Sequence, residues 1–426
     1  MEQFNRFLFA LSLALLLPLP ASLYSQFTID AELRPRFEVR NGYQSLAHED
    51  WTPAVLISQR SRFTFSYRTD DLRLHFSPQD VRLWGGGAEG DLGGFYTNTL
   101  SALDIFEGYA EIRIGNNNWL SVGRQQLIYD NQWLLSGRNW NQASTASDAL
   151  LFKIDREYWR LHIATSWNTI WESPNNNHYP TDGYKTLNFI WYNQKLSDEI
   201  SFSLLHMITG RTEGRFINKI HLRNTSGTYL SYRGDNIFGH ANLYYQYGKS
   251  QEGREVSAGL LAVEAGLVGS IVNPGLGLVV HTGNESTGDS KRRENLFDKV
   301  HSPRHATFGN MDYFTNLEIH TAEGGLVNTY LWASIPLSDN LAVKNTGHLF
   351  WLHKLNPSTP DKKYLGFEND LIVSWQFRKW ANIEGGALFF SPTESLRDLQ
   401  SVPDGRLSRF FYLQMTLKPE LFRSGQ

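Results

Sequence analysis

Strict alternation of apolar and polar side chains is the feature that most constrains this chain. Over residues 27–40, every odd position is apolar or proline, and every even position is Thr, Asp, Glu or Arg. A period of two over this length indicates one strand with an apolar face and a charged face. Ordinary globular strands run to roughly 5–6 residues, whereas a strand that crosses a bilayer needs roughly 9–11.

The same pattern recurs along the chain, with turn-forming clusters of Gly, Asn, Asp, Ser and Pro between the repeats. It is clear at residues 60–68, 158–167 and 410–418, and weaker at 237–247, 341–351, 367–377 and 381–389. Some connections are short (68–71 and 115–118), and others are long and polar (85–100, 172–184 and 284–312). No amphipathic helix of several turns is evident. Short turns on one side and long loops on the other are typical of outer-membrane barrels.

These patterns predict an all-β fold, a single transmembrane antiparallel β-barrel over residues 26–426. At roughly 22 residues per strand and connection, the chain length suits about 18 strands, within a range of 16–18. A propeller would repeat every 40–50 residues or so, and no such repeat is present. A β-sandwich would have shorter strands and more frequent turns.

The first 25 residues have the composition of a secretory signal peptide. Arg6 precedes an apolar run at residues 7–17, Pro18 and Pro20 break this run, and a cleavage between Ser25 and Gln26 is expected. The run is too short to cross a bilayer as a helix. The alternative is a buried N-terminal helix. With the strand pattern, the signal predicts localisation in the outer membrane of a Gram-negative cell.

Composition narrows the function classes. The net charge is −3, from 40 basic and 43 acidic residues, which offers no field for nucleic acid. There are no cysteines to form disulfides, and aromatic residues make up 14% of the chain. Outer-membrane barrels place such residues in girdles at the two lipid interfaces.

Charged side chains of the alternating strands are expected to face the lumen. A lipid-facing charge at the midplane costs about 2–4 kcal/mol. The expected lumen residues are Arg34, Arg36, Arg60, Arg62, Arg124 and Arg160, with Asp30, Glu32, Glu38, Glu107, Glu111 and Asp148. Arg73, Asp80 and Arg82 are added to this set, although Pro78 indicates a β-bulge that leaves their direction open.

The arginines allow two interpretations. Arginine rings select anions in pores, because the guanidinium stays charged and matches carboxylates and phosphates. The arginines could equally pair with neighbouring acids and fill the lumen as a structural ladder. The sequence leaves these two interpretations equally open.

Catalytic and metal-binding interpretations are weaker. Glu107 and Glu111 share a strand face, and acid pairs can cleave glycosides, but acids are common in a polar lumen. The chain has no Cys nucleophile, G-x-S-x-G elbow or H-E-x-x-H motif. The glycine cluster at 85–94 lacks a phosphate-loop lysine, and His301 with His305 is a weak metal signal. We therefore expect no enzyme activity, no cofactor and no metal.

Several segments resemble the alginate export family (alginate export domain) of outer-membrane proteins. They are AELRPRFEVRNG (31–42), ISQRSRFTFSY (57–67), QDVRLWG (79–85), GRQQLIYDNQWLLSGRNWNQ (123–142), GTYLSYRG (227–234), LYYQYGK (243–249), FDKVHSPRHATFGNMDYF (297–314) and LKPELF (417–422). The resemblance implies an 18-stranded barrel with an arginine-rich lumen that passes a polyuronate outward. It implies pore-lining roles for Arg34, Arg36, Arg60, Arg62, Arg124, Arg138 and Asp148.

The resulting functional prediction is an outer-membrane channel for an anionic solute. The expected solute is an acidic polysaccharide or oligosaccharide such as alginate, and the other expected partners are outer-membrane lipid and the barrel-assembly machinery. One alternative is a structural or adhesive barrel whose lumen is closed by salt bridges. A further alternative is a secreted β-rich enzyme acting on polysaccharide.

Overall fold

The computed structural model describes residues 25–424, apart from 86–102, 171, 176–177, 180–182, 215–218, 270, 289–291, 300, 304 and 306. The expected signal peptide lies outside the described residues except for Ser25, and so does nearly all of the glycine cluster at 85–94.

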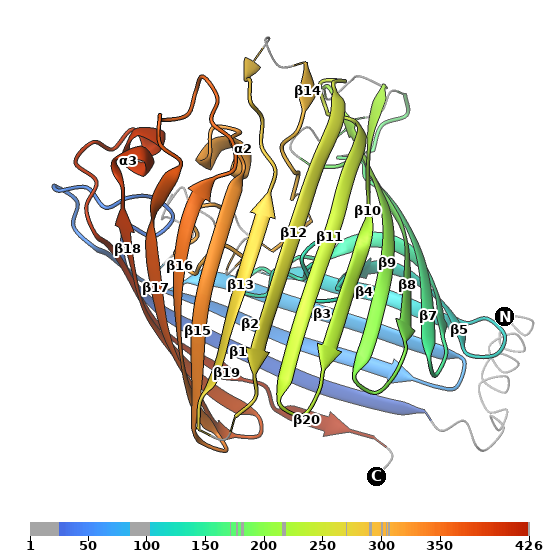
Figure 1. The fold of residues 1–426 in the computed structure, drawn as a ribbon. Helices are drawn as coiled ribbons and strands as arrows, with labels where there is room; N and C mark the ends of the chain where they lie inside the picture. Colours follow the sequence, from blue (N-terminus) through green and yellow to red (C-terminus); the bar gives the residue numbers. More distant parts are fainter. Residues whose placement is uncertain are drawn as a thin grey trace, which may run out of the picture.

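A single antiparallel sheet closes on itself to form a barrel (Figure 1). Strand β1 (Gln26–Asn41) pairs with β2 (Ala54–Arg68) on one edge and with β19 (Ser408–Leu417) and β20 (Glu420–Arg423) on the other. Of the 20 strands, β14 (Arg293–Glu294) is a short parallel addition to β12, and β20 extends β19 along β1. The remaining 18 strands form the wall, which confirms the predicted fold.

The other wall strands follow in chain order, each hydrogen-bonded to the next. They are β3 (Leu72–Leu83), β4 (Leu103–Arg113), β5 (Asn118–Gln125), β6 (Ser147–Asp155), β7 (Trp159–Trp167), β8 (Thr186–Lys195), β9 (Ile200–Thr212), β10 (Ile220–Arg233), β11 (Ile237–Lys249), β12 (Glu255–Leu267), β13 (Asn273–His281), β15 (Leu326–Ser338), β16 (Leu341–Leu352), β17 (Tyr364–Arg378) and β18 (Ala381–Pro392). Two short helices, α2 (Leu317–His320) and α3 (Glu394–Gln400), lie in connections. Among the described residues, no helix is long and apolar enough to cross a membrane.

Short turns and long connections lie at opposite ends of the barrel. The turns at 69–71, 114–117 and 156–158 join β2 to β3, β4 to β5 and β6 to β7. The connections at 126–146, 168–185 and 282–325 leave the other end. In outer-membrane barrels the short turns face the periplasm, so we call that end periplasmic and the other extracellular. The predicted bulge at Pro78 is also present, as a register shift between Ser77 and Pro78 in the pairing of β3 with β4.

The outer face of the wall is apolar. Leu331 and Leu243 are 69% and 59% exposed, whereas the inward-facing Arg34 of β1 is only 3% exposed. Exposed tryptophans lie near both ends of the outer face, including Trp84 and Trp167 toward the extracellular end and Trp375 toward the periplasmic end. A closed barrel with this surface is stable only in a bilayer, which confirms the expected location in the outer membrane.

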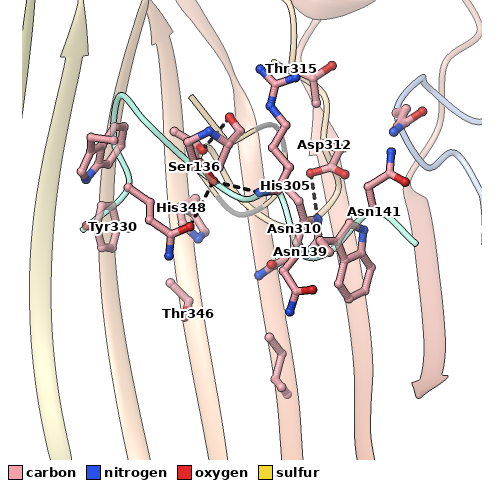
Figure 2. A pocket seen from close by; sticks show the side chains of 18 of the residues that line it. Ser136, Asn139, Asn141, His305, Asn310, Asp312, Thr315, Tyr330, Thr346 and His348 are labelled. Atoms are coloured by element: carbon pink, nitrogen blue, oxygen red, sulfur yellow. Dashed lines mark hydrogen bonds and ion pairs between the residues drawn. The ribbon is translucent and has the colours of Figure 1, made fainter. Parts of the chain in front are cut away.

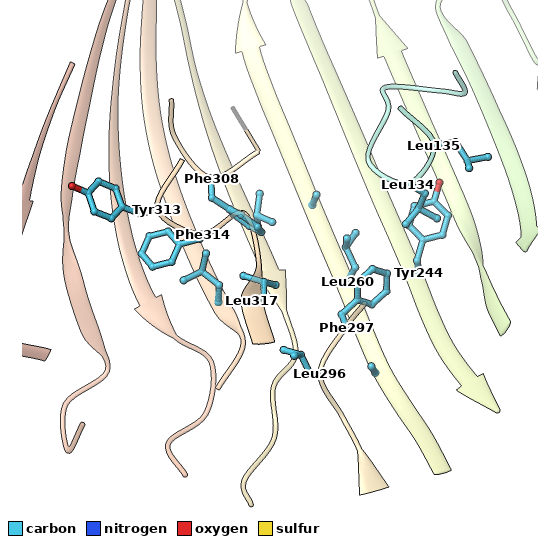
Figure 3. Close-up of a cluster of buried hydrophobic side chains, with 14 of the residues drawn as sticks. Leu134, Leu135, Tyr244, Leu260, Leu296, Phe297, Phe308, Tyr313, Phe314 and Leu317 are labelled. Atoms are coloured by element: carbon cyan, nitrogen blue, oxygen red, sulfur yellow. The ribbon is translucent and has the colours of Figure 1, made fainter. Parts of the chain in front are cut away.

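The inner face carries apolar side chains as well as charged ones. Leu187, Phe189 and Trp191 of β8 point inward and are buried, as are Phe350 of β16 and Phe390 of β18. They pack against two chain segments inside the lumen, which we call the first inner segment (residues 126–146) and the second inner segment (the described residues of 295–325). Figure 3 shows side chains of both segments against the wall. The lumen therefore contains a hydrophobic core.

The outer face provides the first test. We expect Leu331→Arg to lower the free energy of unfolding by about 2–4 kcal/mol, because a lipid-facing arginine at mid-strand must be desolvated. Leu331→Met keeps the surface apolar and should change stability by less than about 1.5 kcal/mol. Denaturant titration of tryptophan fluorescence in lipid vesicles measures both. Equal stability of the two variants would contradict a lipid-facing position.

Candidate functional site

The first inner segment is bound to the wall by two buried arginines. Arg34 Nε donates to Gln142 Oε1 at 3.0 Å, and an Nη atom donates to the Asn141 carbonyl at 3.2 Å. Arg60, which is fully buried, donates to the carbonyls of Gln142 at 2.5 Å and Asn141 at 2.7 Å, and to Asn139 Oδ1 at 2.9 Å. A guanidinium offers five donors in a planar fork, so one side chain can satisfy a whole turn of backbone carbonyls. These two arginines hold the segment in place.

Arg36 and Arg62 lie on either side of this anchor. Arg36 donates to the Trp140 carbonyl at 2.9 Å, stacks 3.9 Å from the Trp140 ring centre, and donates to Glu38 at 2.5 Å. Arg62 donates to Gln79 Oε1 at 2.7 Å and lies 3.6 Å from the ring centre of Phe106. Both stabilise the lumen wall, and Arg36 also lines the cavity described below.

The second inner segment is bound by carboxylates. Glu368 accepts a hydrogen bond from the Met311 N–H at 2.9 Å, and Asp370 accepts from the Asn310 side chain at 2.7 Å and its N–H at 3.1 Å. Gly309 has φ +74°, and a Cβ there would lie within 2.6 Å of the Glu368 carboxylate. Glycine is therefore required where the backbone passes this acid. The wall thus uses arginines for the carbonyls of one segment and acids for the N–H groups of the other.

The two inner segments also contact each other. The Trp140 and His305 rings stack with centres 3.8 Å apart, and His305 Nδ1 lies 3.0 Å from Asp312 Oδ1. Tyr43, in the connection after β1, donates to Asp312 Oδ2 at 2.5 Å. Arg138 Nε donates to the Ser302 carbonyl at 2.9 Å. Together these contacts join the segments into one insert across the lumen.

A cavity of about 1290 Å³ remains between the insert and the wall (Figure 2). Its lining is mostly amide, hydroxyl and aromatic. Four cationic side chains, those of Arg36, Arg40, Arg138 and Lys344, line it, against the two carboxylates of Glu264 and Asp312. The aromatic lining residues are Tyr43, Trp133, Trp140, Tyr330 and Trp332. Such a lining can hold a polar solute by hydrogen bonds and stack against a flat ring or sugar face.

The remaining expected lumen residues differ in position. Arg138 lines the cavity, and Arg160 faces the lumen near the periplasmic end, 4.0 Å from Asp155. Arg124 and Asp148 instead pair in register on the outer face, so the expected lumen position of both is corrected. The alternation of β5 places Trp119 and Ser121 inward, and the even positions therefore point outward. Asp80 and Arg82 also lie on the outer face, where they form an ion pair at 2.5 Å.

Glu368 and Asp370 of β17 and Lys344 were not among the expected lumen residues. Glu368 and Asp370 alternate with Phe367 and Leu371, so the strand pattern alone could have placed them inward. Nothing in the pattern shows that they bind the second inner segment, because that contact joins residues distant in sequence.

Catalytic and metal sites receive no support from the described geometry. Glu111 binds Lys153 at 2.6 Å and Arg73 at 3.3 Å, and Glu107 accepts a hydrogen bond from the Gln126 N–H at 3.0 Å, so neighbouring groups engage both acids. Among the described residues, no group of three or more His, Asp or Glu side chains could hold a metal ion. Burial lowers the pKa of His301 to about 3, so this imidazole is neutral at physiological pH.

Comparison with known proteins identifies the fold. No protein-family model matches the chain, and no curated protein sequence matches it. The solved structure of OpdL from Pseudomonas aeruginosa matches with a TM-score of 0.62 at 10% identity, over 93% of this chain and 99% of that one. OccAB2 from Acinetobacter baumannii matches with 0.61 at 10% identity, over 93% and 98%. OpdK from Pseudomonas aeruginosa, solved with vanillate, matches with 0.58 at 10% identity, over 93% and 99%.

The resemblance to the alginate export family is therefore wrong. The matching structures are outer-membrane porins of the OprD, Opd and Occ group, and no family model supports the other assignment. The motifs that suggested it are strand segments rich in aromatic and arginine residues, together with parts of both inner segments. Barrel geometry imposes such alternation on many unrelated sequences, so short matches of this kind do not distinguish families.

The arginine anchor gives a second test. Arg60→Met leaves the Gln142 carbonyl without its arginine donor and the Asn141 carbonyl with Arg34 alone, and we expect the first inner segment to detach. Limited proteolysis of the detergent-solubilised barrel should then cut within residues 126–146, where the unsubstituted protein resists. Arg68→Met is the control, because Arg68 lies on the same face of β2 but is exposed. Equal resistance in both variants would show that Arg60 does not hold the segment.

Proposed function

We propose that this chain is an outer-membrane channel that passes a small anionic solute through the lumen cavity. The observation that carries the proposal is the cavity between the insert and the wall, with four cationic side chains against two carboxylates. Cationic rings in a narrow, low-dielectric passage favour anions.

The two carboxylates that line the cavity, those of Glu264 and Asp312, already contact other side chains of the protein. Tyr330 donates to Glu264 at 2.8 Å, and Tyr43 and His305 both contact Asp312. Arg36 and Arg40 share the buried Glu38, which offsets part of their charge. Lys344 differs: it is exposed, its Nζ lies 4.9 Å from the Trp332 ring centre, and it has no carboxylate within ion-pair distance among the described residues. Lys344 is the cation that we propose meets the solute.

The lining suggests the class of solute. Asparagine, threonine and serine side chains suit hydroxyl groups, and tryptophan rings suit aromatic or sugar faces. An acidic saccharide or an aromatic carboxylate combines these features with a negative charge. The solved complex of the similarly folded OpdK with vanillate, an aromatic carboxylate, agrees with this class. Outer-membrane lipid and the barrel-assembly machinery are the further partners that this location requires.

A closed structural barrel is the second candidate. It is favoured by the anchoring of Arg34 and Arg60, whose donors are directed to the first inner segment and not to the cavity. This candidate expects no conductance in a planar bilayer, whereas the channel expects discrete conductance steps. A secreted enzyme is less well supported, because neighbouring groups engage Glu107 and Glu111.

The reversal potential under a salt gradient tests the selectivity. We expect the unsubstituted protein to prefer anions, and Lys344→Glu to shift the reversal potential toward cation preference without loss of conductance. Lys362→Glu, in the connection between β16 and β17 and outside the cavity lining, is a charge-matched control and should behave as the unsubstituted protein.

Added solutes complete the experiment. Galacturonate or vanillate should reduce the current at concentrations where neutral galactose does not. Cation preference in the unsubstituted protein, or equal shifts in Lys344→Glu and Lys362→Glu, would contradict the proposal.

A further inference from the structure

Glycines on the inner face of β12 and β13 make room for aromatic rings of the neighbouring strand. The register of the sheet sets Gly266 opposite Gly275, and it sets Gly275 and Gly277 opposite Trp332 and Tyr330 of β15. A Cβ at Gly275 would lie 2.3 Å from Trp332 Cζ2, and a Cβ at Gly277 would lie 2.1 Å from Tyr330 Cζ. The two rings therefore occupy the space above these glycines and lie against the backbone of the wall.

Other side chains fix both rings in place. The Phe238 ring centre lies 5.8 Å from that of Trp332 with 29° between the planes, and a Cβ at Gly266 would lie within 2.9 Å of both rings. The Tyr330 hydroxyl donates to Glu264 Oε2 at 2.8 Å. We call Trp332 and Tyr330 the aromatic patch. Both of its rings line the cavity, and Figure 2 shows Tyr330 on this side of it.

Lys344 lies over one ring of the aromatic patch. Its Nζ is 4.9 Å from the Trp332 ring centre, a cation–π distance. Trp332 is only 9% exposed, with the wall on one side and Lys344 over the ring. The lysine side chain is long and exposed in the lumen, so an anion that binds its ammonium can draw it away from the indole. The ring is then available for stacking.

The charges around the aromatic patch give it a direction. Lys344 pairs with Ser334 toward the periplasmic end of the patch, and Glu264 lies toward its extracellular end. A carboxylate is therefore attracted at one end and repelled at the other. Asn242, further toward the extracellular end, lines the same cavity and is 1% exposed, and its Oδ1 accepts no hydrogen bond from the described residues. An unpaired buried acceptor beside a cavity suits the hydroxyl group of a solute.

We propose that the aromatic patch, with Lys344, is a binding subsite for a single pyranose ring that carries a carboxylate. The carboxylate binds Lys344, the C–H face of the sugar stacks on Trp332, and hydroxyl groups at the far end of the ring meet Glu264 and Asn242. A pyranose carries hydroxyl groups around its edge, and this matches the polar extracellular end of the subsite better than an aromatic carboxylate does. The inference rests on the proposed channel and adds that a ring is preferred over an open chain of equal charge.

Block of the channel current compares a ring with a chain. Galacturonate and galactonate have the same number of carbon atoms and one carboxylate each, but galacturonate closes into a pyranose and galactonate remains open. We expect galacturonate to block half of the current at a concentration about tenfold lower than galactonate, because only the ring can stack on the indole. Equal block by the two, or stronger block by vanillate than by galacturonate, would overturn the proposal.

Two substitutions test the aromatic patch itself. Trp332→Leu removes the stacking ring, and Gly275→Ala displaces it from the wall while the tryptophan remains. We expect both to bring the galacturonate and galactonate concentrations close to equality. Trp375→Leu on the outer face of β17 and Gly239→Ala on the outer face of β11 are the matched controls, and both should keep the tenfold preference. Heat-modifiable migration on a gel shows which variants are folded. An undiminished preference in folded Trp332→Leu or Gly275→Ala would overturn the proposal.

The same recordings separate this inference from the proposed function. An anion-selective current that galacturonate and galactonate block equally would overturn the subsite and leave the proposed channel intact. A cation-selective current, or none from a folded barrel, would overturn both.

Discussion

Backbone hydrogen bonding in the absence of water constrains everything else in this structure. Hydrocarbon offers no partner to an N–H or C=O group, so each strand of the wall must pair on both edges. β1 meets this requirement by pairing with β2 along one edge and with β19 and then β20 along the other. Once the sheet is closed, alternate side chains must face lipid, and the opposite set must face the lumen.

The same requirement governs the chain inside the lumen. The two inner segments are irregular, so their backbone groups need side-chain partners when they are buried. Arg34 and Arg60 supply donors to the carbonyls of the first segment, and Glu368 and Asp370 supply acceptors to the N–H groups of the second. The charges therefore first build the insert. Lys344, which has no ion-pair partner among the described residues, is the charge that remains available to a solute.

The sequence was sufficient to predict the strands of the wall, but it did not predict how the two inner segments bind inside the lumen. Alternation at residues 27–40 fixed β1 and its faces, because side-chain direction in a strand is a local property. The alternation was misleading for Arg124 and Asp148. These residues lie on the short strands β5 and β6, next to the first inner segment, and both strands carry a charge on the outer face. It gave no role to Glu368, since its partner Met311 is distant in sequence. One signal was available: residues 189–192 of β8 are all apolar or aromatic, so both faces carry such side chains there, which indicates contact on both sides.

The central claim is that the insert narrows the lumen without closing it. Swelling of liposomes that contain the refolded barrel, in isotonic solutions of solutes of increasing size, tests this claim most directly. The account predicts rapid swelling with small carboxylates and progressively slower swelling as the size of the solute increases. Absence of swelling with every solute, from a barrel shown to be folded, would contradict it and would identify the insert as a plug.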